Sequence, residues 1–240
     1  MKLSVIIPAY NEAKTIVPTV TEIADYLSAR NPAGVDDFEV IVVDDGSLDQ
    51  TASLVEKLNL PGLKLIRHPK NLGKGAAVKS GVYHSTGDYF LFTDADNSTK
   101  ISELGPFLDR LNRDCDIAIG SRADKDSKIL THQARWKEFL GRQGNKAIRL
   151  ITGLPFKDTQ CGFKVFNRNC LGIFEKLTLS GWAFDVELLV IARLNDFKVI
   201  DLPVSWNNNP DSRMKLGSYP EFLIDTFRIF VNKLKRKYRI

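Results

Sequence analysis

The sequence has no long hydrophobic run and few cysteines. No segment reaches the roughly eighteen consecutive apolar residues that a membrane span needs, so we expect a soluble or peripheral protein. The three cysteines, Cys115, Cys161 and Cys170, are odd in number and lack metal-site spacing. In a chain without a signal peptide, we expect them to be reduced thiols in or near the core of a cytosolic protein.

Two common nucleotide-binding motifs are also absent. The glycine-rich segment 71–81 (NLGKGAAVKSG) has Val78 where a P-loop needs a glycine. Gly73 and Gly75 lack the third glycine of a dinucleotide fingerprint and do not follow the first expected strand. The segment therefore supports neither an ATPase nor a dinucleotide oxidoreductase. It is either a loop that enters a helix or, through Lys74 and Lys79, a contact to a diphosphate.

The chain is long enough for one sizeable core, with 240 residues of which 43% are hydrophobic. Apolar runs predict strands at residues 3–8, 38–43, 63–67, 89–93 and 116–120, with helical patterns between them. Ser47 and Gln50 predict a capping box for a helix through Leu58. Strands that alternate with helices predict an α/β fold, a mostly parallel sheet flanked by helices, in a single fused domain.

Two carboxylates follow the strand expected at residues 89–93. Asp94 and Asp96 flank Ala95, and side chains two apart in an extended segment point to the same side. They can face a cation beyond the carboxyl end of the strand, where open α/β sheets bind ligands. Mg2+ or Mn2+ suits oxygen ligands, and Mg2+ is usually held by carboxylates plus substrate phosphates. The pair predicts a metal-held nucleotide diphosphate, or else only a polar turn.

Several motifs together carry a family resemblance. SVIIPAYNE, IVVDDGS, NLGKGAA, TDAD and GSR, in this order and spacing, resemble family 2 inverting glycosyltransferases with the Rossmann-like GT-A fold. DTQCGFK, GWAFDVEL and LPVSW narrow the resemblance to dolichyl-phosphate β-glucosyltransferases and related polyprenyl-phosphate glycosyltransferases. It implies one GT-A domain over residues 1–240. Residues 1–122 would bind the nucleotide sugar, residues 123–218 would form the acceptor half, and residues 219–240 an amphipathic helix and basic tail.

The resemblance also implies roles for single residues. Nucleotide contacts are implied for Pro8, Tyr10, Glu12, Val43, Asp45, Asp94, Ala95 and one of Arg213 and Lys215. Asp94 and Asp96 match the metal motif; Asn97 and Ser98 stand where mannosyl relatives tend to carry a glutamine ligand, which shifts coordination toward Asp96. Arg122 matches an arginine that meets the phosphates or the acceptor phosphate, where a guanidinium can bind bidentately. Two arginines of the next basic segment, Arg135 and Arg142, are further expected acceptor-phosphate contacts.

The implied reaction is transfer of glucose from UDP-glucose to a polyprenyl (dolichyl) phosphate with inversion, giving a β-linked lipid-phosphate sugar. Mg2+ or Mn2+ at Asp94 and Asp96 would neutralise charge on the departing diphosphate. A phosphate acceptor needs no strong base; a sugar hydroxyl would, and Asp185 is then the candidate unless it only begins a helix. The alternatives are transfer of mannose or an N-acetylhexosamine, a saccharide acceptor, or a non-catalytic nucleotide-sugar sensor.

The net charge of +5 is concentrated in two segments. The last thirteen residues hold six cations and no acid, and residues 128–149 hold six cations and only Glu138. No nucleic-acid module is visible, so we expect no nucleic acid but an anionic membrane surface as partner, or else simply solvated faces. The expected location is cytoplasmic, peripheral on the cytosolic face of a membrane.

The C-terminal segment is predicted to contribute to that attachment. A helical spacing predicts one core-facing side, with Ile229 on the other side of the helix. The core-facing residues would be Phe222, Leu223, Thr226, Phe227, Phe230, Val231 and Leu234. The following residues 233–240 are expected either to be solvated or to lie against anionic headgroups.

Overall fold

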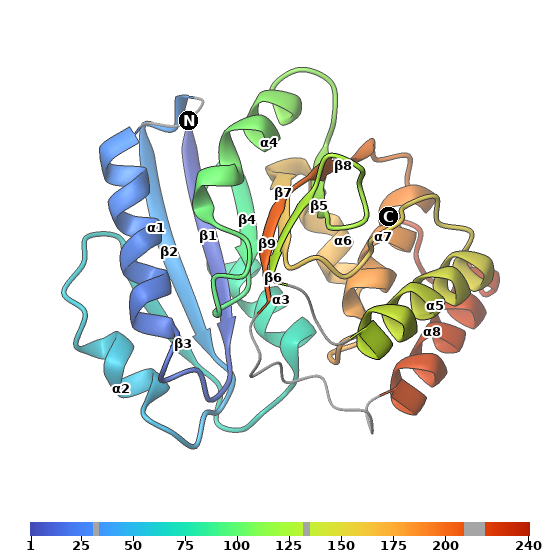
Figure 1. Cartoon of the computed structure of the whole chain (residues 1–240), viewed down its shortest axis with the longest axis horizontal. Coiled ribbons are helices and arrows are strands. Elements are labelled where there is room, and N and C mark those ends of the chain that lie inside the picture. The colour runs from blue at the N-terminus through green and yellow to red at the C-terminus, as the bar shows by residue number, and fades with distance from the viewer. Residues whose placement is uncertain (31–33, 132–134, 209–218) are drawn as a thin grey trace.

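The computed structural model describes residues 1–30, 34–131, 135–208 and 219–240, without the side chains of residues 30, 135–140, 142, 219 and 220. A seven-stranded sheet in the order β3-β2-β1-β4-β7-β5-β8 forms its centre (Figure 1). The strands are β1 (Lys2–Ala9), β2 (Asp37–Asp44), β3 (Leu63–Arg67), β4 (Tyr89–Thr93), β5 (Ile117–Ser121), β7 (Phe163–Asn167) and β8 (Val199–Pro203). The five expected strands are each found to within one residue at either end.

All neighbouring strands of this sheet run parallel except β7, which is antiparallel to β4 and β5. Two short strands, β6 (Lys128–Thr131) and β9 (Ser205–Asn207), form a separate parallel pair. The predicted mostly parallel α/β fold is therefore confirmed. The antiparallel β7 brings its amino end to the edge of the sheet where β4 and β5 have their carboxyl ends.

Helices cover both faces of the sheet because alternate strand residues point to opposite sides. Leu3, Val5 and Ile7 of β1 pack in the core beneath α1 (Ile16–Arg30), α2 (Thr51–Glu56) and α4 (Leu104–Leu111). Ile6 packs in the core of the other face, which includes α3 (Lys74–His84), α6 (Leu171–Lys176) and α7 (Phe184–Leu194). Two short 3-10 turns, η2 (Ile101–Glu103) and η3 (Arg168–Cys170), precede α4 and α6.

Helices α5 (Arg135–Thr152) and α8 (Tyr219–Leu234) lie side by side outside this second face (Figure 1). None of the helices in the described part of the chain is long and apolar enough to cross a bilayer. The three cysteines are unpaired and buried, as expected, and burial raises the pKa of Cys115 and of Cys161 to about 11.

Two local predictions are wrong. Helix α2 begins at Thr51 with Gln50 before it, and Ser47 instead accepts a hydrogen bond from the Asn11 backbone N–H at 2.9 Å. In α8, Ile229 is buried whereas Leu223 and Phe227 are half exposed, so the core-facing side is rotated from the predicted one. Helical spacing leaves two apolar stripes on α8, and packing against α7 selects the one that contains Ile229.

The basic tail is also not free. Tyr238 is fully buried, and its hydroxyl donates to Glu187 Oε1 at 2.7 Å. The Asn195 side chain donates to the Tyr238 carbonyl at 2.7 Å and accepts from the Ile240 backbone N–H at 2.8 Å. The tail therefore folds back onto α7, while Leu234, Ile240 and most of its cationic side chains remain exposed. The expectation that residues 233–240 are either solvated or laid on headgroups is wrong for Tyr238.

Candidate functional site

The loops after β1 and β2 are tied together beside the carboxyl edge of the sheet. The Asn11 side chain accepts from the Leu48 backbone N–H at 2.7 Å, and the Glu12 backbone N–H donates to Thr51 Oγ1 at 2.7 Å. Asn11 has a positive φ of 53°, which asparagine tolerates better than most residues. These bonds fix the loop that carries two of the expected nucleoside contacts, Tyr10 and Glu12.

Asp45 organises the glycine-rich loop. Its buried carboxylate accepts from the backbone N–H groups of Leu72 and Gly73 at 2.9 and 2.8 Å, and lies 2.7 Å from His68 Nδ1. Gly73 has a φ of 102°, and a Cβ there would lie 2.4 Å from the Ser180 carbonyl oxygen, so the turn requires glycine. The loop thus enters α3 in a fixed position and presents Lys74 to the end of β4.

Asp94 and Asp96 lie just beyond β4, as the sequence predicts. Lys74 forms an ion pair with Asp94, with 2.6 Å between Nζ and Oδ1, and its ammonium lies 5.5 Å from the centre of the Trp182 ring. Burial opposes the charge of Lys74, but Asp94, Asp185 and Asp96 outweigh it and raise the lysine pKa. A permanent positive charge therefore stands beside the carboxylate pair.

The residues present fit a divalent cation. Burial, reinforced by the neighbouring Asp94 charge, raises the pKa of Asp96, although the Ser98 backbone N–H donates to its Oδ1 at 3.0 Å. A bound cation would relieve that repulsion, and oxygen donors suit Mg2+ or Mn2+. Among the described residues no group of three His, Cys, Asp or Glu gathers around a point. Asp94 and Asp96 would thus share the cation with substrate phosphates rather than enclose it.

Arg122, the residue after β5, is held by Asp158. Its Nε and Nη2 donate to the two carboxylate oxygens at 2.7 and 2.9 Å, and its backbone N–H donates to Oδ2 at 2.9 Å. The guanidinium carbon lies 5.4 Å from the centre of the Trp206 ring. The side chain keeps 30% exposure, so the guanidinium is fixed in orientation and still reaches solvent.

Asp185, the candidate base, is buried in the first turn of α7. Its Oδ1 accepts from Nζ of Lys164 at 2.5 Å, and Lys164 is fully buried on β7. Burial raises the pKa of Asp185, against the opposing charges of Lys164 and Lys74. At 2% exposure, the carboxylate is enclosed among side chains and does not face solvent.

The remaining expected contacts are placed as follows. Pro8 and Tyr10 are partly exposed near the end of β1, whereas the Val43 side chain is fully buried and the side chain of Ala95 nearly so. Arg135 and Arg142 lie on α5, but their side chains are not described. The expected contacts Arg213 and Lys215 lie outside the described residues.

Sequence reasoning missed three residues of this site. Asp158, Gly162 and Lys164 all belong to the DTQCGFK motif, which the resemblance singled out without giving its residues roles. The signal that could have found them is their composition. A lysine within an otherwise apolar strand pattern needs a buried partner.

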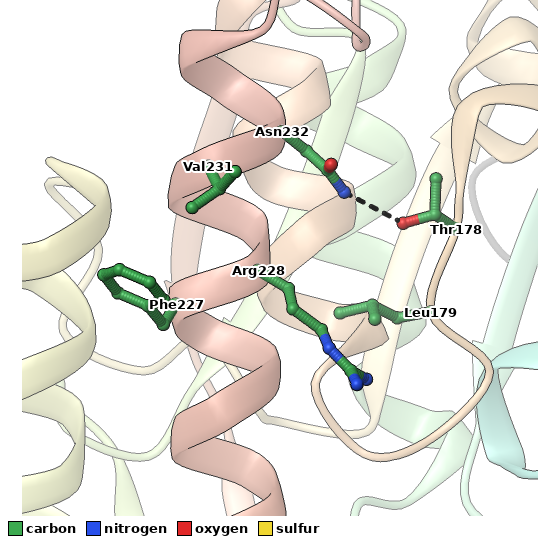
Figure 2. A pocket seen from close by; sticks show the side chains of 6 residues that line it. All are labelled: Thr178, Leu179, Phe227, Arg228, Val231 and Asn232. Carbon is green, nitrogen blue, oxygen red and sulfur yellow. Dashed lines mark hydrogen bonds between the residues drawn. The ribbon is translucent and has the colours of Figure 1, made fainter.

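An open groove of about 450 Å3 lies elsewhere, between α8 and the loop before α7 (Figure 2). It is lined by Thr178, Leu179, Phe227, Arg228, Val231 and Asn232. Asn232 donates to Thr178 Oγ1 at 3.4 Å, and Arg228 extends along the groove toward Leu179 (Figure 2). The groove contains neither carboxylate of the pair beyond β4, so it is not the candidate nucleotide site.

A mostly parallel sheet, a carboxylate pair beyond β4 and hydrogen-bonded loops after β1 and β2 form the arrangement expected of a GT-A glycosyltransferase. Residues 4–172 match the model of the family described as "Glycosyl transferase family 2". The chain belongs to this family.

Similar proteins cover most of the chain. It is 38% identical over 238 residues to dolichyl-phosphate beta-glucosyltransferase ALG5C of Trichomonas vaginalis, a match that covers 94% of this chain and 70% of that protein. It is 35% identical over 239 residues to the dolichyl-phosphate beta-glucosyltransferase of Saccharomyces cerevisiae, covering 90% and 70%. Glucosyl-3-phosphoglycerate synthase from Mycobacterium tuberculosis, solved with Mn2+, UDP-glucose and phosphoglyceric acid, matches with a TM-score of 0.67 at 18% identity, covering 96% and 79%. The structural match supports the GT-A fold.

Proposed function

We propose that the protein transfers glucose from UDP-glucose to the phosphate of a long-chain polyprenol, with inversion at the anomeric carbon. The observation that carries this proposal is the similarity, over at least 90% of the chain, to two dolichyl-phosphate beta-glucosyltransferases. The products would be a β-linked lipid-phosphate sugar and UDP.

On the donor side, the tied loops after β1 and β2 would hold the nucleoside, through Pro8, Tyr10, Glu12, Val43 and Asp45. Asp94 and Asp96 would hold Mg2+ or Mn2+, and Lys74 would add a second positive charge beside the diphosphate. The cation supplies charge neutralisation to the UDP leaving group. Positive charge fixed before the reaction stabilises the developing diphosphate charge without rearrangement.

On the acceptor side, Arg122 would bind the lipid phosphate. The hydrogen bonds from Nε and Nη2 to Asp158 orient the guanidinium, and its exposed part can donate to phosphate oxygens. A phosphate acceptor is already anionic near neutral pH and needs no base. The enclosure of Asp185 against Lys164 agrees with that chemistry, because a general base must reach the attacking group. Contacts from Arg135, Arg142 and either Arg213 or Lys215 remain part of the proposal.

A panel of nucleotide sugars tests the reaction directly. Free nucleotide is measured with UDP-glucose, GDP-mannose and UDP-N-acetylhexosamines, each with and without polyprenyl phosphate, in Mg2+ or Mn2+. We expect release of UDP from UDP-glucose that depends on the lipid phosphate. Release only from another donor would replace glucose by that sugar. If the protein binds a nucleotide sugar but releases no free nucleotide in any combination, the remaining interpretation is a non-catalytic nucleotide-sugar sensor.

We further propose that the enzyme works as a peripheral protein on the cytosolic face of an anionic membrane. Helix α8 exposes an apolar stripe formed by Leu223, Ile224, Phe227 and Leu234, which are 50–66% exposed. Exposed cations lie within and beyond the stripe, at Arg228, Lys235, Arg236, Lys237 and Arg239. Apolar side chains among cations suit an interfacial helix on anionic lipid. In a two-fold dimer the same surface would bring like charges together.

The buried side of α8 approaches the loop that precedes α7. Asp225 of α8 approaches Gly181, where a Cβ would lie 3.9 Å from its Oδ2. The next residue, Trp182, stacks against Lys74, the partner of Asp94. Helix α8 is thus linked through this loop to Lys74 and Asp94.

Sedimentation with vesicles tests this attachment. We expect binding to anionic vesicles that falls when salt rises to about 0.5 M, because salt screens surface charge. Phe227→Ser should weaken binding, and Tyr83→Ser, a half-exposed aromatic on α3, should not. Equal binding to neutral and anionic vesicles would contradict the electrostatic part, and equal effects of the two variants would contradict the role of α8.

A further inference from the structure

Strand β7 brings the segment 161–164 against the carboxylate pair. Its antiparallel register with β4 pairs Phe163 with Thr93, and the next residues continue it because the Asp94 backbone N–H donates to the Gly162 carbonyl at 3.2 Å. Residues far apart in the chain are thus neighbours at the edge of the site. The position of the Asp94 side chain therefore depends on the space that is left by the absence of a side chain at Gly162.

Gly162 leaves room for the Asp94 carboxylate. A Cβ on Gly162 would lie 1.9 Å from Oδ2 and 2.3 Å from Cγ of Asp94. The φ of Gly162 is outside the left-handed region, so the backbone itself does not demand glycine here. The atoms that a methyl group would meet first belong to the end of the Asp94 side chain, which can rotate away. A side chain at position 162 would therefore displace the Asp94 carboxylate and disturb its ion pair with Lys74, while the atoms that it meets first include no backbone atom.

Lys164 fixes the same segment, residues 161–164, through its buried ammonium. Its ammonium is fully buried, donates to the Cys161 carbonyl at 2.6 Å and to Asp185 at 2.5 Å, and lies 5.0 Å from the centre of the Phe92 ring. A buried ammonium is costly unless it is paired and hydrogen-bonded. The Lys164 ammonium thus links Cys161, before β7, to Asp185 in the first turn of α7. Cys161 is the residue next to Gly162, which lies against Asp94.

We propose that Gly162 and Lys164 are positioning residues for the metal-binding carboxylate Asp94. Gly162 provides the space that the Asp94 carboxylate occupies. Lys164 fixes the Cys161–Gly162 peptide next to that space through its hydrogen bond to the Cys161 carbonyl. Neither residue touches substrate or cation. The inference rests on the proposed role of Asp94 in holding Mg2+ or Mn2+.

Binding of Mn2+ in the presence of UDP tests Gly162 without any turnover. Free Mn2+ is measured by electron paramagnetic resonance during titration of the wild type, Gly162→Ala and Gly105→Ala. Gly105 lies on α4, and a Cβ there would meet nothing within 4 Å, so Gly105→Ala is the matched control. Loss of a group that orients a ligand weakens metal binding roughly 10- to 100-fold. We expect this loss for Gly162→Ala alone, with an unfolding midpoint close to that of the wild type.

The outcomes separate this inference from the proposed function. Wild-type protein that binds UDP but no Mn2+ would refute the role of Asp94 itself, and with it the inference. Wild-type binding with an unchanged affinity in Gly162→Ala would overturn the inference alone. Unfolding of Gly162→Ala would also overturn it, because the clash was predicted to move only the Asp94 side chain.

Lys164 needs a second variant, since Lys164→Met alone leaves a buried carboxylate unpaired. Lys164→Met combined with Asp185→Asn removes both charges and retains similar shapes. If Lys164 holds the Cys161 carbonyl, the double variant folds but binds Mn2+ roughly tenfold or more weakly. If the folded double variant binds Mn2+ with wild-type affinity, the positioning role of Lys164 is overturned. Lys164 would then serve only to neutralise the buried charge of Asp185.

Discussion

Replacing Asp158 by asparagine should remove the anchor of Arg122 at a cost that the structure allows to be worked out. Asp158 is 2% exposed and accepts three hydrogen bonds from Arg122. Burial opposes its charge, but Arg122 outweighs burial and lowers the carboxyl pKa from 3.8 to about 2. The asparagine side chain would keep the shape but lose the charge, which leaves the guanidinium without its counter-ion.

The lowered pKa fixes the size and the pH window of the effect. A fall from 3.8 to about 2 corresponds to about 2–3 kcal/mol of folding free energy, at about 1.4 kcal/mol for each pH unit. This is below the roughly 3–5 kcal/mol of fully buried pairs, which agrees with the 30% exposure of Arg122. Because the folded-state pKa lies below the unfolded one, the contribution is complete above about pH 5. It is lost as the pH falls through about 2.

Urea unfolding of the wild type and Asp158→Asn at several pH values measures this directly. The difference in unfolding free energy should be about 2–3 kcal/mol at about pH 7 and about pH 5, and should narrow to less than about 1 kcal/mol near about pH 2. A difference that stays constant across this pH range would show that the carboxylate charge is not what the pair contributes. Other acidic groups titrate in both proteins, so they cancel in the difference.

Three further predictions follow from the site and the tail. Asp96→Ala should abolish UDP release in the transfer assay while leaving the unfolding midpoint near that of the wild type; turnover within a few-fold of wild type at equal folded protein would refute the metal assignment. Arg122→Ala, compared at equal folded protein, should reduce acceptor use tenfold or more, because a charge-assisted hydrogen bond contributes about 1.5–3 kcal/mol; an equal loss of UDP affinity by calorimetry would place the arginine on the donor side. Deletion of residues 233–240 removes the buried Tyr238 and should destabilise the fold by roughly 3–5 kcal/mol, the cost of removing a buried large aromatic side chain. The double substitution Lys235→Glu with Lys237→Glu should instead leave the unfolding midpoint unchanged and weaken only binding to anionic vesicles.

The strands and helices that are determined by residues adjacent in the sequence could be predicted from the sequence. Each of the five expected strands is a short apolar run ended by turn residues, and such runs fix a buried strand locally. The position of Asp94 and Asp96 beyond β4 follows from the same run. Asp185, also singled out, does lie in the first turn of a helix, which is one of the two interpretations that its sequence context allowed.

Contacts that depend on long-range packing could not be predicted in this way. The pairing of Lys164 with Asp185 and of Arg122 with Asp158 requires knowing that β7 lies between β4 and β5 and runs against both. The core-facing side of α8 was mistaken because its spacing supports two apolar stripes, and only packing against α7 chooses between them. Tyr238 within a basic tail gives no local sign that its hydroxyl donates to Glu187.

The direction of β7 explains why one short motif contacts both Asp94 and Arg122. A parallel strand between β4 and β5 would bring its carboxyl end to the edge of the sheet that carries the candidate site, followed by a loop that leaves the sheet. The antiparallel β7 instead begins there, so the seven residues of DTQCGFK enter the sheet between the residues that follow β4 and β5. Asp158 at the start of the motif orients Arg122, and Gly162 near its end receives Asp94. Asp94, the proposed donor-side ligand, and Arg122, the proposed acceptor contact, therefore both pack against one short segment, and a shift of that segment would move both.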